Sequence, residues 1–293
     1  MKTDYQDFML FFTFLMLWIS IQFGQIIEDS IAYVIVLSLG IIHGANDLSI
    51  LKKKEYKTPY YIRDIAIYLL LILCCVVSYL LVPFISIILF IILSSYHFGE
   101  QHLSKKLTGI SSYKIIVYIF YGLLIFCMIF IQNMKDVDRI LINLTNLTIP
   151  KSWIQGTLIA AGSFLTLSFT YHFFIKKERN IEVVREVFYL LLLFLVFKTS
   201  SLILGFAIYF VLWHSVPSIL DQVKYLSGVS SKKTILSYFK KALIYWLLSI
   251  TTLALIYYFV DAHSFNSIIF LTLFSVTAPH VWVMYRMNIT PNE

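Results

Sequence analysis

Long apolar segments recur along the whole chain, separated by short polar connections. Each contains about 17 to 25 residues, enough for a helix to cross a hydrocarbon layer of about 30 Å. No segment shows the alternating pattern of a membrane β-barrel, so helices are the only way to satisfy the backbone in lipid. We expect about ten membrane-spanning helices, near Phe8–Ile27, Ile31–Leu51, Asp64–Val82, Phe84–Leu103, Tyr113–Ile131, Trp153–Ile175, Glu182–Phe197, Leu202–Leu220, Leu236–Val260 and Phe265–Tyr285.

Composition agrees with this pattern. Of the 293 residues, 59% are hydrophobic and 13% are charged, whereas soluble domains have about 45–50% and 25%. No segment has the composition of a soluble domain or a flexible linker. We therefore predict an all-α, polytopic membrane helical bundle, with residues 1–293 forming a single integral-membrane domain.

The basic residues predict the orientation. If Met1 is cytoplasmic, all but four of the 23 Lys and Arg fall on inner segments, the exceptions being Lys135, Arg139, Lys151 and Lys198. This asymmetry follows the positive-inside rule, so the net charge of +7 requires no nucleic-acid partner. We expect both termini in the cytoplasm and a multi-pass protein of the inner cell membrane, with the lipid bilayer as its partner.

Four of the seven histidines share one predicted depth. His43, His97, His214 and His280 lie on the second, fourth, eighth and tenth expected spans, which all run from outside to inside. They precede the next basic residue by 9, 8, 10 and 6 residues, a spread of about 6 Å at a helical rise of about 1.5 Å per residue. Ionisable residues inside a membrane usually face the bundle interior. A shared polar or metal site is therefore indicated.

The remaining histidines and the cysteines have simpler interpretations. His172 is expected nearer the membrane interface, and His102 and His263 are expected in solvated loops. The three cysteines, in the third and fifth spans, show no metal or disulfide spacing and are expected to serve as small apolar residues.

Two acidic residues accompany these histidines. Asp47 follows His43 by one helical turn, and Glu100 follows His97 closely. Each is either a carboxylate that orients a metal-bound imidazole or an interfacial anchor. Imidazole ligands suit zinc, copper, iron or nickel, and the absence of nearby cysteine disfavours a structural zinc site. Open coordination positions would suit iron and dioxygen, with an apolar substrate supplied by the bilayer.

The motifs around these histidines resemble a known family. His43-Gly44 followed by Asp47, Tyr96-His97-Phe98-Gly99, Trp213-His214-Ser215 and Pro279-His280 are similar, in order, to motifs of the Brp/Blh family of β-carotene 15,15′-dioxygenases. The resemblance implies a helical membrane enzyme that uses non-haem Fe(2+) and O₂ to cleave the central double bond of β-carotene. The product would be two molecules of all-trans-retinal, which commonly serve microbial rhodopsins.

The resemblance also implies roles for individual residues. His43, His97 and His214 would bind iron, Asp47 and Glu100 would orient ligands, and Tyr96 and Trp213 would line the substrate pocket. The family often has a histidine where this chain has Ser218. Either His280 completes the site, which we favour, or three histidines and water hold the metal, or the activity has changed.

Other functional classes agree less well with the sequence. A transporter or proton-coupled carrier with a histidine relay is the main alternative, although no inverted repeat is visible. A di-iron desaturase would need more clustered histidines, and a rhodopsin would need a lysine in the centre of a span, whereas Lys198 lies at a span end.

Overall fold

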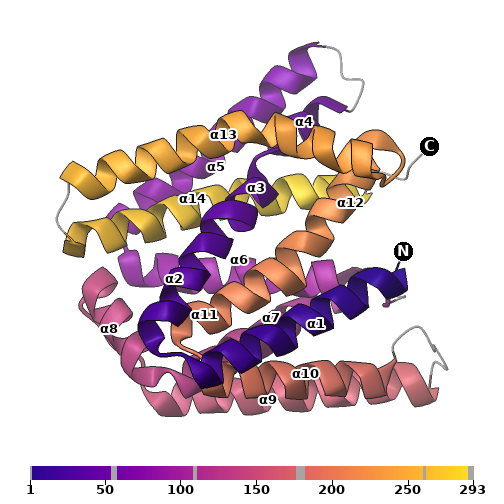
Figure 1. Ribbon diagram of the computed structural model, residues 1–293, viewed down its shortest axis with the longest axis vertical. Coiled ribbons are helices and arrows are strands. Elements are labelled where there is room, and N and C mark those ends of the chain that lie inside the picture. Colours follow the sequence, from indigo (N-terminus) through magenta and orange to yellow (C-terminus); the bar gives the residue numbers. More distant parts are fainter. Residues whose placement is uncertain (1, 54–57, 108–110, 176–181, 260–261, 290–293) are drawn as a thin grey trace. The chain divides into compact units, whose positions relative to one another are not determined.

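The computed structural model describes residues 2–53, 58–107, 111–175, 182–259 and 262–289. Within these ranges every regular element is a helix, and no strand occurs (Figure 1). The prediction of an all-α chain is confirmed. The elements are α1 Lys2–Gln22, α2 Gln25–Ile35, η1 Val36–Gly40, α3 Ile41–Gly44, α4 Asp47–Lys53, α5 Thr58–Leu81, α6 Pro83–Leu103, α7 Ser111–Gln132, α8 Met134–Thr145, α9 Lys151–Thr170, η2 Tyr171–Ile175, α10 Val183–Thr199, α11 Leu202–Ala207, η3 Ile208–Ser215, α12 Val216–Ser227, α13 Lys232–Phe259 and α14 Ala262–Ile289.

Every expected span coincides with a helix or a run of consecutive helices, but fewer qualify as membrane-spanning. In the described part of the chain, seven helical stretches are long and apolar enough to cross a membrane. The helices α1, α9 and α10 are not among them. Helix α10 has only 17 residues, and the sequence of α9 contains several Ser, Thr, Gly and Gln residues among its apolar ones. The count of ten is therefore not supported. The orientation of the termini stays a prediction.

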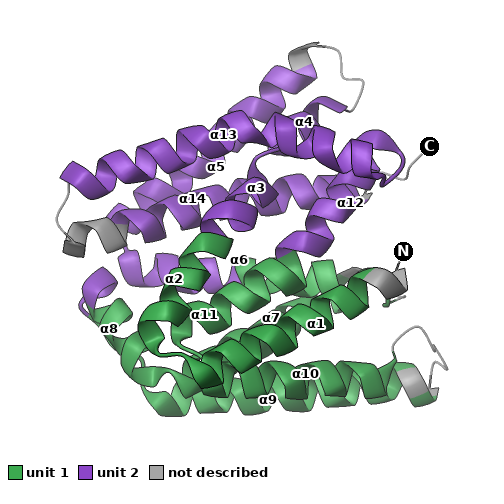
Figure 2. Cartoon of the chain, in the orientation of Figure 1, with its two compact units in different colours: residues 1–35, 94–142, 147–214 green, residues 36–93, 143–146, 215–293 purple. Residues whose placement is uncertain are grey.

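The described residues form two compact units (Figure 2). The first comprises residues 1–35, 94–142 and 147–214, and the second comprises residues 36–93, 143–146 and 215–293. Helix α6 contributes to both, because the division falls between Leu93 and Ser94. Each unit is described by itself, and the expected single domain stays a prediction.

In the first unit, α7 packs against α9 and α10, α1 packs against α10, and α2 packs against α11. Two glycines allow a very close approach between α7 and the end of α6. A Cβ atom on Gly99 would lie 2.1 Å from the carbonyl oxygen of Tyr118, and one on Gly122 would lie 2.2 Å from the backbone of Ser95. Small residues of this kind are how membrane helices approach backbone to backbone.

In the second unit, α14 packs along α5, while α13 packs against α3 and α12. A cluster of buried apolar residues joins α4 to the last turns of α14, namely Ile50, Leu51, Val283, Met284 and Met287. The fully buried carboxylate of Asp64 on α5 accepts a hydrogen bond of 2.5 Å from Arg286 on α14. This ion pair ties together the ends of the two helices.

Two of the predicted histidines lie beside irregular helical turns. His43 follows the π-helical turn η1, and His214 lies within the π-helical segment η3. The helix that carries His43 is then interrupted at Ala45 and Asn46 before α4 begins at Asp47. Wide π turns inside α-helices occur frequently at functional sites because they change the direction in which side chains point.

Candidate metal centre

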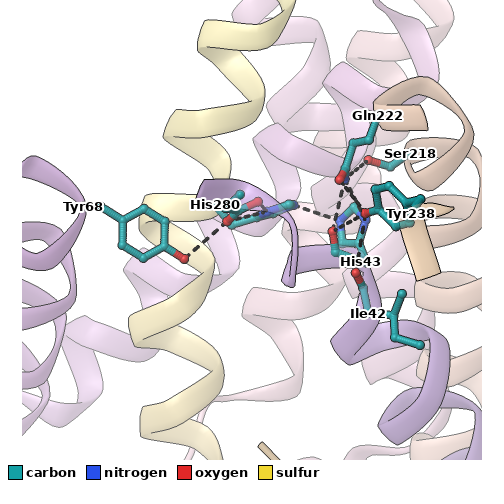
Figure 3. A network of polar contacts seen from close by, with 8 residues as sticks. Ile42, His43, Tyr68, Ser218, Gln222, Tyr238 and His280 are labelled. Carbon is teal, nitrogen blue, oxygen red and sulfur yellow. Dashed lines mark hydrogen bonds and ion pairs between the residues drawn. The ribbon is translucent and has the colours of Figure 1, made fainter. Parts of the chain in front are cut away.

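His43 and His280 form a buried pair in the second unit. His43 comes from α3 and His280 from α14, and their Nε2 atoms lie 2.9 Å apart (Figure 3). Their rings meet edge to face, with centroids 4.5 Å apart. Both side chains are almost fully buried.

The spacing of these nitrogens suits a metal ion. Two imidazole nitrogens that bind one ion at about 2.1 Å with an angle of about 90° are about 3 Å apart. The observed 2.9 Å agrees with such a pair of neighbouring ligands. These two side chains could therefore take a metal with little movement.

Asp47 fixes the orientation of His280. The Nδ1–H group of His280 donates to Asp47 Oδ1 at 2.8 Å and lies 3.1 Å from Oδ2. A carboxylate can only accept here, so the proton belongs on Nδ1 and the lone pair of Nε2 faces His43. Tyr68 on α5 donates to Asp47 Oδ2 at 3.3 Å. A carboxylate that holds an imidazole in this way is a common feature of metal-binding histidines.

The sequence does not name the imidazole that Asp47 contacts. In the structure it is His280 on α14, and Asp47 follows a short interruption of the helix at Ala45 and Asn46. The role of Asp47 in orienting a metal ligand stays a prediction.

His43 is held by a buried amide. The side-chain nitrogen of Gln222 on α12 lies 3.4 Å from His43 Nδ1, 3.1 Å from the His43 carbonyl oxygen and 3.3 Å from Ser218 Oγ. Tyr238 on α13 donates to Gln222 Oε1 at 2.7 Å. Ser218, at the position where the family often has a histidine, therefore contacts Gln222.

His97 and His214 form a second buried pair, in the first unit. His97 comes from α6 and His214 from η3, and their ring centroids are 4.5 Å apart at 76°. Phe98 packs against His214 with centroids 4.7 Å apart, and Phe210 stacks on it at 5.9 Å. This pair is set among aromatic rings.

The other predicted residues of the first unit have partners of their own. Tyr96 donates to Glu100 Oε1 at 3.0 Å. Trp213 is buried, donates to Thr13 Oγ1 at 3.1 Å and packs edge-on against Tyr189. The roles of Glu100 in orienting a ligand, and of Tyr96 and Trp213 in lining a pocket, stay predictions.

Two of the three remaining histidines, His102 and His263, differ from expectation. His102 is not in a solvated loop, because it occupies the last turn of α6, stacks on Tyr121 and lies 2.6 Å from Glu186 Oε2. Lys106 donates to the same carboxylate, which explains why this charged cluster can be buried. His263 falls within α14 rather than a loop, and its side chain lies outside the described residues. His172 is buried against Tyr113.

Gln222, Tyr238 and Tyr68 were not predicted from the sequence. Gln222 carries a weak signal, because it follows Ser218 by four residues and so lies on the same face of α12. The two tyrosines carry none, since the chain contains 20 of them.

Comparison with known proteins identifies the family. No curated protein and no solved structure matches the chain. The family model described as Beta-carotene 15,15′-dioxygenase matches residues 34–288, a range that includes both histidine pairs and Asp47. The chain therefore belongs to the β-carotene 15,15′-dioxygenase family.

Proposed function

We propose that the protein is an Fe(2+)-dependent dioxygenase of the inner cell membrane that cleaves the central 15,15′ double bond of β-carotene. One molecule of β-carotene and one of O₂ would give two molecules of all-trans-retinal, which accounts for every atom. The family match over residues 34–288 supports this proposal most strongly. The helices that are long enough to cross a membrane agree with an apolar substrate taken from lipid.

His43, His97, His214 and His280 are the proposed iron ligands. Support comes from their common predicted depth, from the burial of all four, and from the 2.9 Å separation of His43 and His280 Nε2. Bound iron would activate dioxygen beside the double bond. Asp47 keeps the proton of His280 on Nδ1, so that Nε2 keeps a lone pair for the ion.

The aromatic residues around His214 suit a flat polyene. Phe98 and Phe210 pack on the imidazole, and Phe206 stacks on Phe210 with their ring planes 9° apart. Such surfaces pack well against conjugated chains and exclude water. We propose that Tyr96 and Trp213 extend these walls, and that retinal passes to a microbial rhodopsin.

One observation favours a different function. In the second unit, hydrogen bonds connect Tyr238, Gln222, His43, His280 and Asp47 in one continuous series. A proton-coupled carrier with a histidine relay would use such a series. It would not need iron or O₂, and this separates the two hypotheses.

The direct test is expression in cells that accumulate β-carotene, with retinal measured by chromatography. We expect the orange colour to fade and retinal to appear at two molecules per β-carotene consumed, only in the presence of O₂. The matched control is His172→Ala, a buried histidine outside the proposed site, which should retain activity. A well-expressed protein that leaves β-carotene intact would exclude the proposed reaction.

A further inference from the structure

Helix α1 contacts the segment that carries His214. The indole N–H of Trp213, the residue directly before His214, donates to Thr13 Oγ1 at 3.1 Å. The Thr13 hydroxyl donates its own hydrogen to the Met9 carbonyl oxygen at 2.7 Å, so its oxygen acts as the acceptor for the indole. Thr13 and Trp213 are both buried and belong to the same unit (Figure 2). These hydrogen bonds therefore hold the indole against α1.

A second contact from α1 reaches the backbone of the same segment. The hydroxyl of Tyr5 donates to the carbonyl oxygen of Leu212. In a π-helix this carbonyl would accept from the N–H group five residues later, but that residue is Pro217, which has no N–H. Tyr5 therefore supplies a hydrogen that the π-helical pattern of η3 cannot supply. Such a contact matters because a buried polar group without a partner is costly.

Together the two contacts restrain the rotation of η3 about its axis. Successive side chains along a helix are separated by a fixed angle, so holding the backbone of Leu212 and the side chain of Trp213 determines where His214 points. Trp213 also packs edge-on against Tyr189 of α10, with ring centroids 5.0 Å apart. A π-helical segment and a regular α-helix turn their side chains by different angles. The direction of His214 therefore depends on the pattern that these contacts maintain.

We propose that Tyr5 and Thr13 are positioning residues for His214, so that α1 supports metal binding through η3 without contacting the metal. This inference rests on the proposed metal-binding function. The family model begins at residue 34, so neither residue lies in the range that it matches. The inference thus assigns a role in the site to a helix outside that range.

Two substitutions at Thr13 separate positioning from packing. Thr13→Val keeps the shape but removes the hydroxyl that accepts from Trp213, so we expect Co²⁺ affinity to fall about tenfold, at the lower end of the range of about 10–100-fold for residues that support metal ligands. Thr13→Ser keeps the hydroxyl and removes a methyl group, so its affinity should equal that of the parent. Affinity is read from the absorption of bound Co²⁺ in the purified full chain. If packing alone mattered, Thr13→Ser would be the weaker variant, and that order would overturn the proposal.

Tyr5→Phe tests the second contact in the same assay, because it removes only the hydroxyl that donates to Leu212. We expect a similar fall in Co²⁺ affinity. Ser20→Ala is the matched control, since it removes another buried hydroxyl of α1, one that lies 3.0 Å from Thr199 Oγ1 and about two turns from Thr13. It should leave affinity unchanged. Thermal unfolding of each variant identifies any loss of fold, and parent affinity in folded Tyr5→Phe and Thr13→Val would overturn the proposal.

A second readout needs no metal and so separates this inference from the proposed function. With ¹³C,¹⁵N-labelled histidine in the metal-free chain, the ring signals of His214, assigned by their loss in His214→Ala, should move in Thr13→Val and stay in place in Thr13→Ser. If the parent binds no Co²⁺, the metal site is wrong, whereas these signals still decide whether α1 positions His214. If the parent binds Co²⁺ and the His214 signals do not move, only the role of α1 is wrong.

Discussion

At the scale of single residues, the hydrogen bond between Asp47 and His280 does most to define the proposed site. A carboxylate with 2% exposure is stable here because two donors satisfy it, His280 Nδ1 and the Tyr68 hydroxyl. The same contact fixes the hydrogen of His280 and directs its Nε2 lone pair. In the proposed site, Asp47 would therefore orient His280 without binding the metal itself.

The substitution Asp47→Asn tests this directly. It keeps the size of the side chain but replaces the carboxylate by a neutral amide, which lacks the charge that holds the His280 hydrogen on Nδ1. We expect iron or Co²⁺ affinity to fall by about 10–100-fold, measured by metal titration of the purified chain.

Tyr68→Phe is the matched control for Asp47→Asn. It removes only the longer hydrogen bond to the same carboxylate, at 3.3 Å, and should change affinity much less. Equal losses in the two variants would show that the contact matters for packing alone.

The four histidines and Asp47 stand out in the sequence because ionisable side chains in apolar helices are costly. Gln222 does not, since an amide is less costly in a membrane helix and forms hydrogen bonds in many contexts. Its role depends on α12, α13 and α3 meeting, and that is a tertiary property. The identity of the imidazole beside Asp47, which is His280, depends on tertiary packing in the same way.

At the scale of elements, the positions of the long helices were predictable, whereas several of their ends and the irregular turns were not. The span expected from Phe84 corresponds to α6, which begins one residue earlier at Pro83, because proline fits the first turn of a helix. The interruption at Ala45 and Asn46 contains no proline and follows Gly44, so apolar periodicity alone does not reveal it. The helix α8 lies outside the expected spans, because its sequence is too polar to predict one.

The contact between α6 and α7 gives a prediction at this scale. Gly99→Ala or Gly122→Ala would introduce a Cβ within 2.2 Å of a neighbouring backbone, so the helices must separate. Overpacking usually costs about 1–3 kcal/mol, and we expect the thermal unfolding midpoint in detergent to drop clearly.

Gly156→Ala is the matched control for this prediction, because no atom lies within 4 Å of the added methyl group. It should leave the midpoint unchanged or raise it slightly, since alanine favours a helix by about 0.5–1 kcal/mol. If all three alanine variants unfold at the temperature of the parent, the close approach of α6 and α7 is wrong.

At the scale of the whole molecule, the all-helical architecture follows from composition, because a helix satisfies the backbone hydrogen bonds of an apolar segment within lipid. The number of spans does not follow as directly. The helices α1, α9 and α10 are present, but they are not among the seven stretches in the described part of the chain that are long and apolar enough to cross a membrane. Apolar runs identify helices well, whereas their depth in a membrane depends on neighbours and flanking charges.

The central proposal is that His43, His97, His214 and His280 are the iron ligands. Its most direct test is the iron content per chain after anaerobic loading and removal of free metal, for the parent and for His43→Ala, His97→Ala, His214→Ala and His280→Ala, with His172→Ala as control. We predict one iron per chain in the parent and the control, and a large loss in each of the four variants. Full iron in His280→Ala together with loss in His43→Ala would contradict the fourth ligand, and full iron in all four would contradict the site itself.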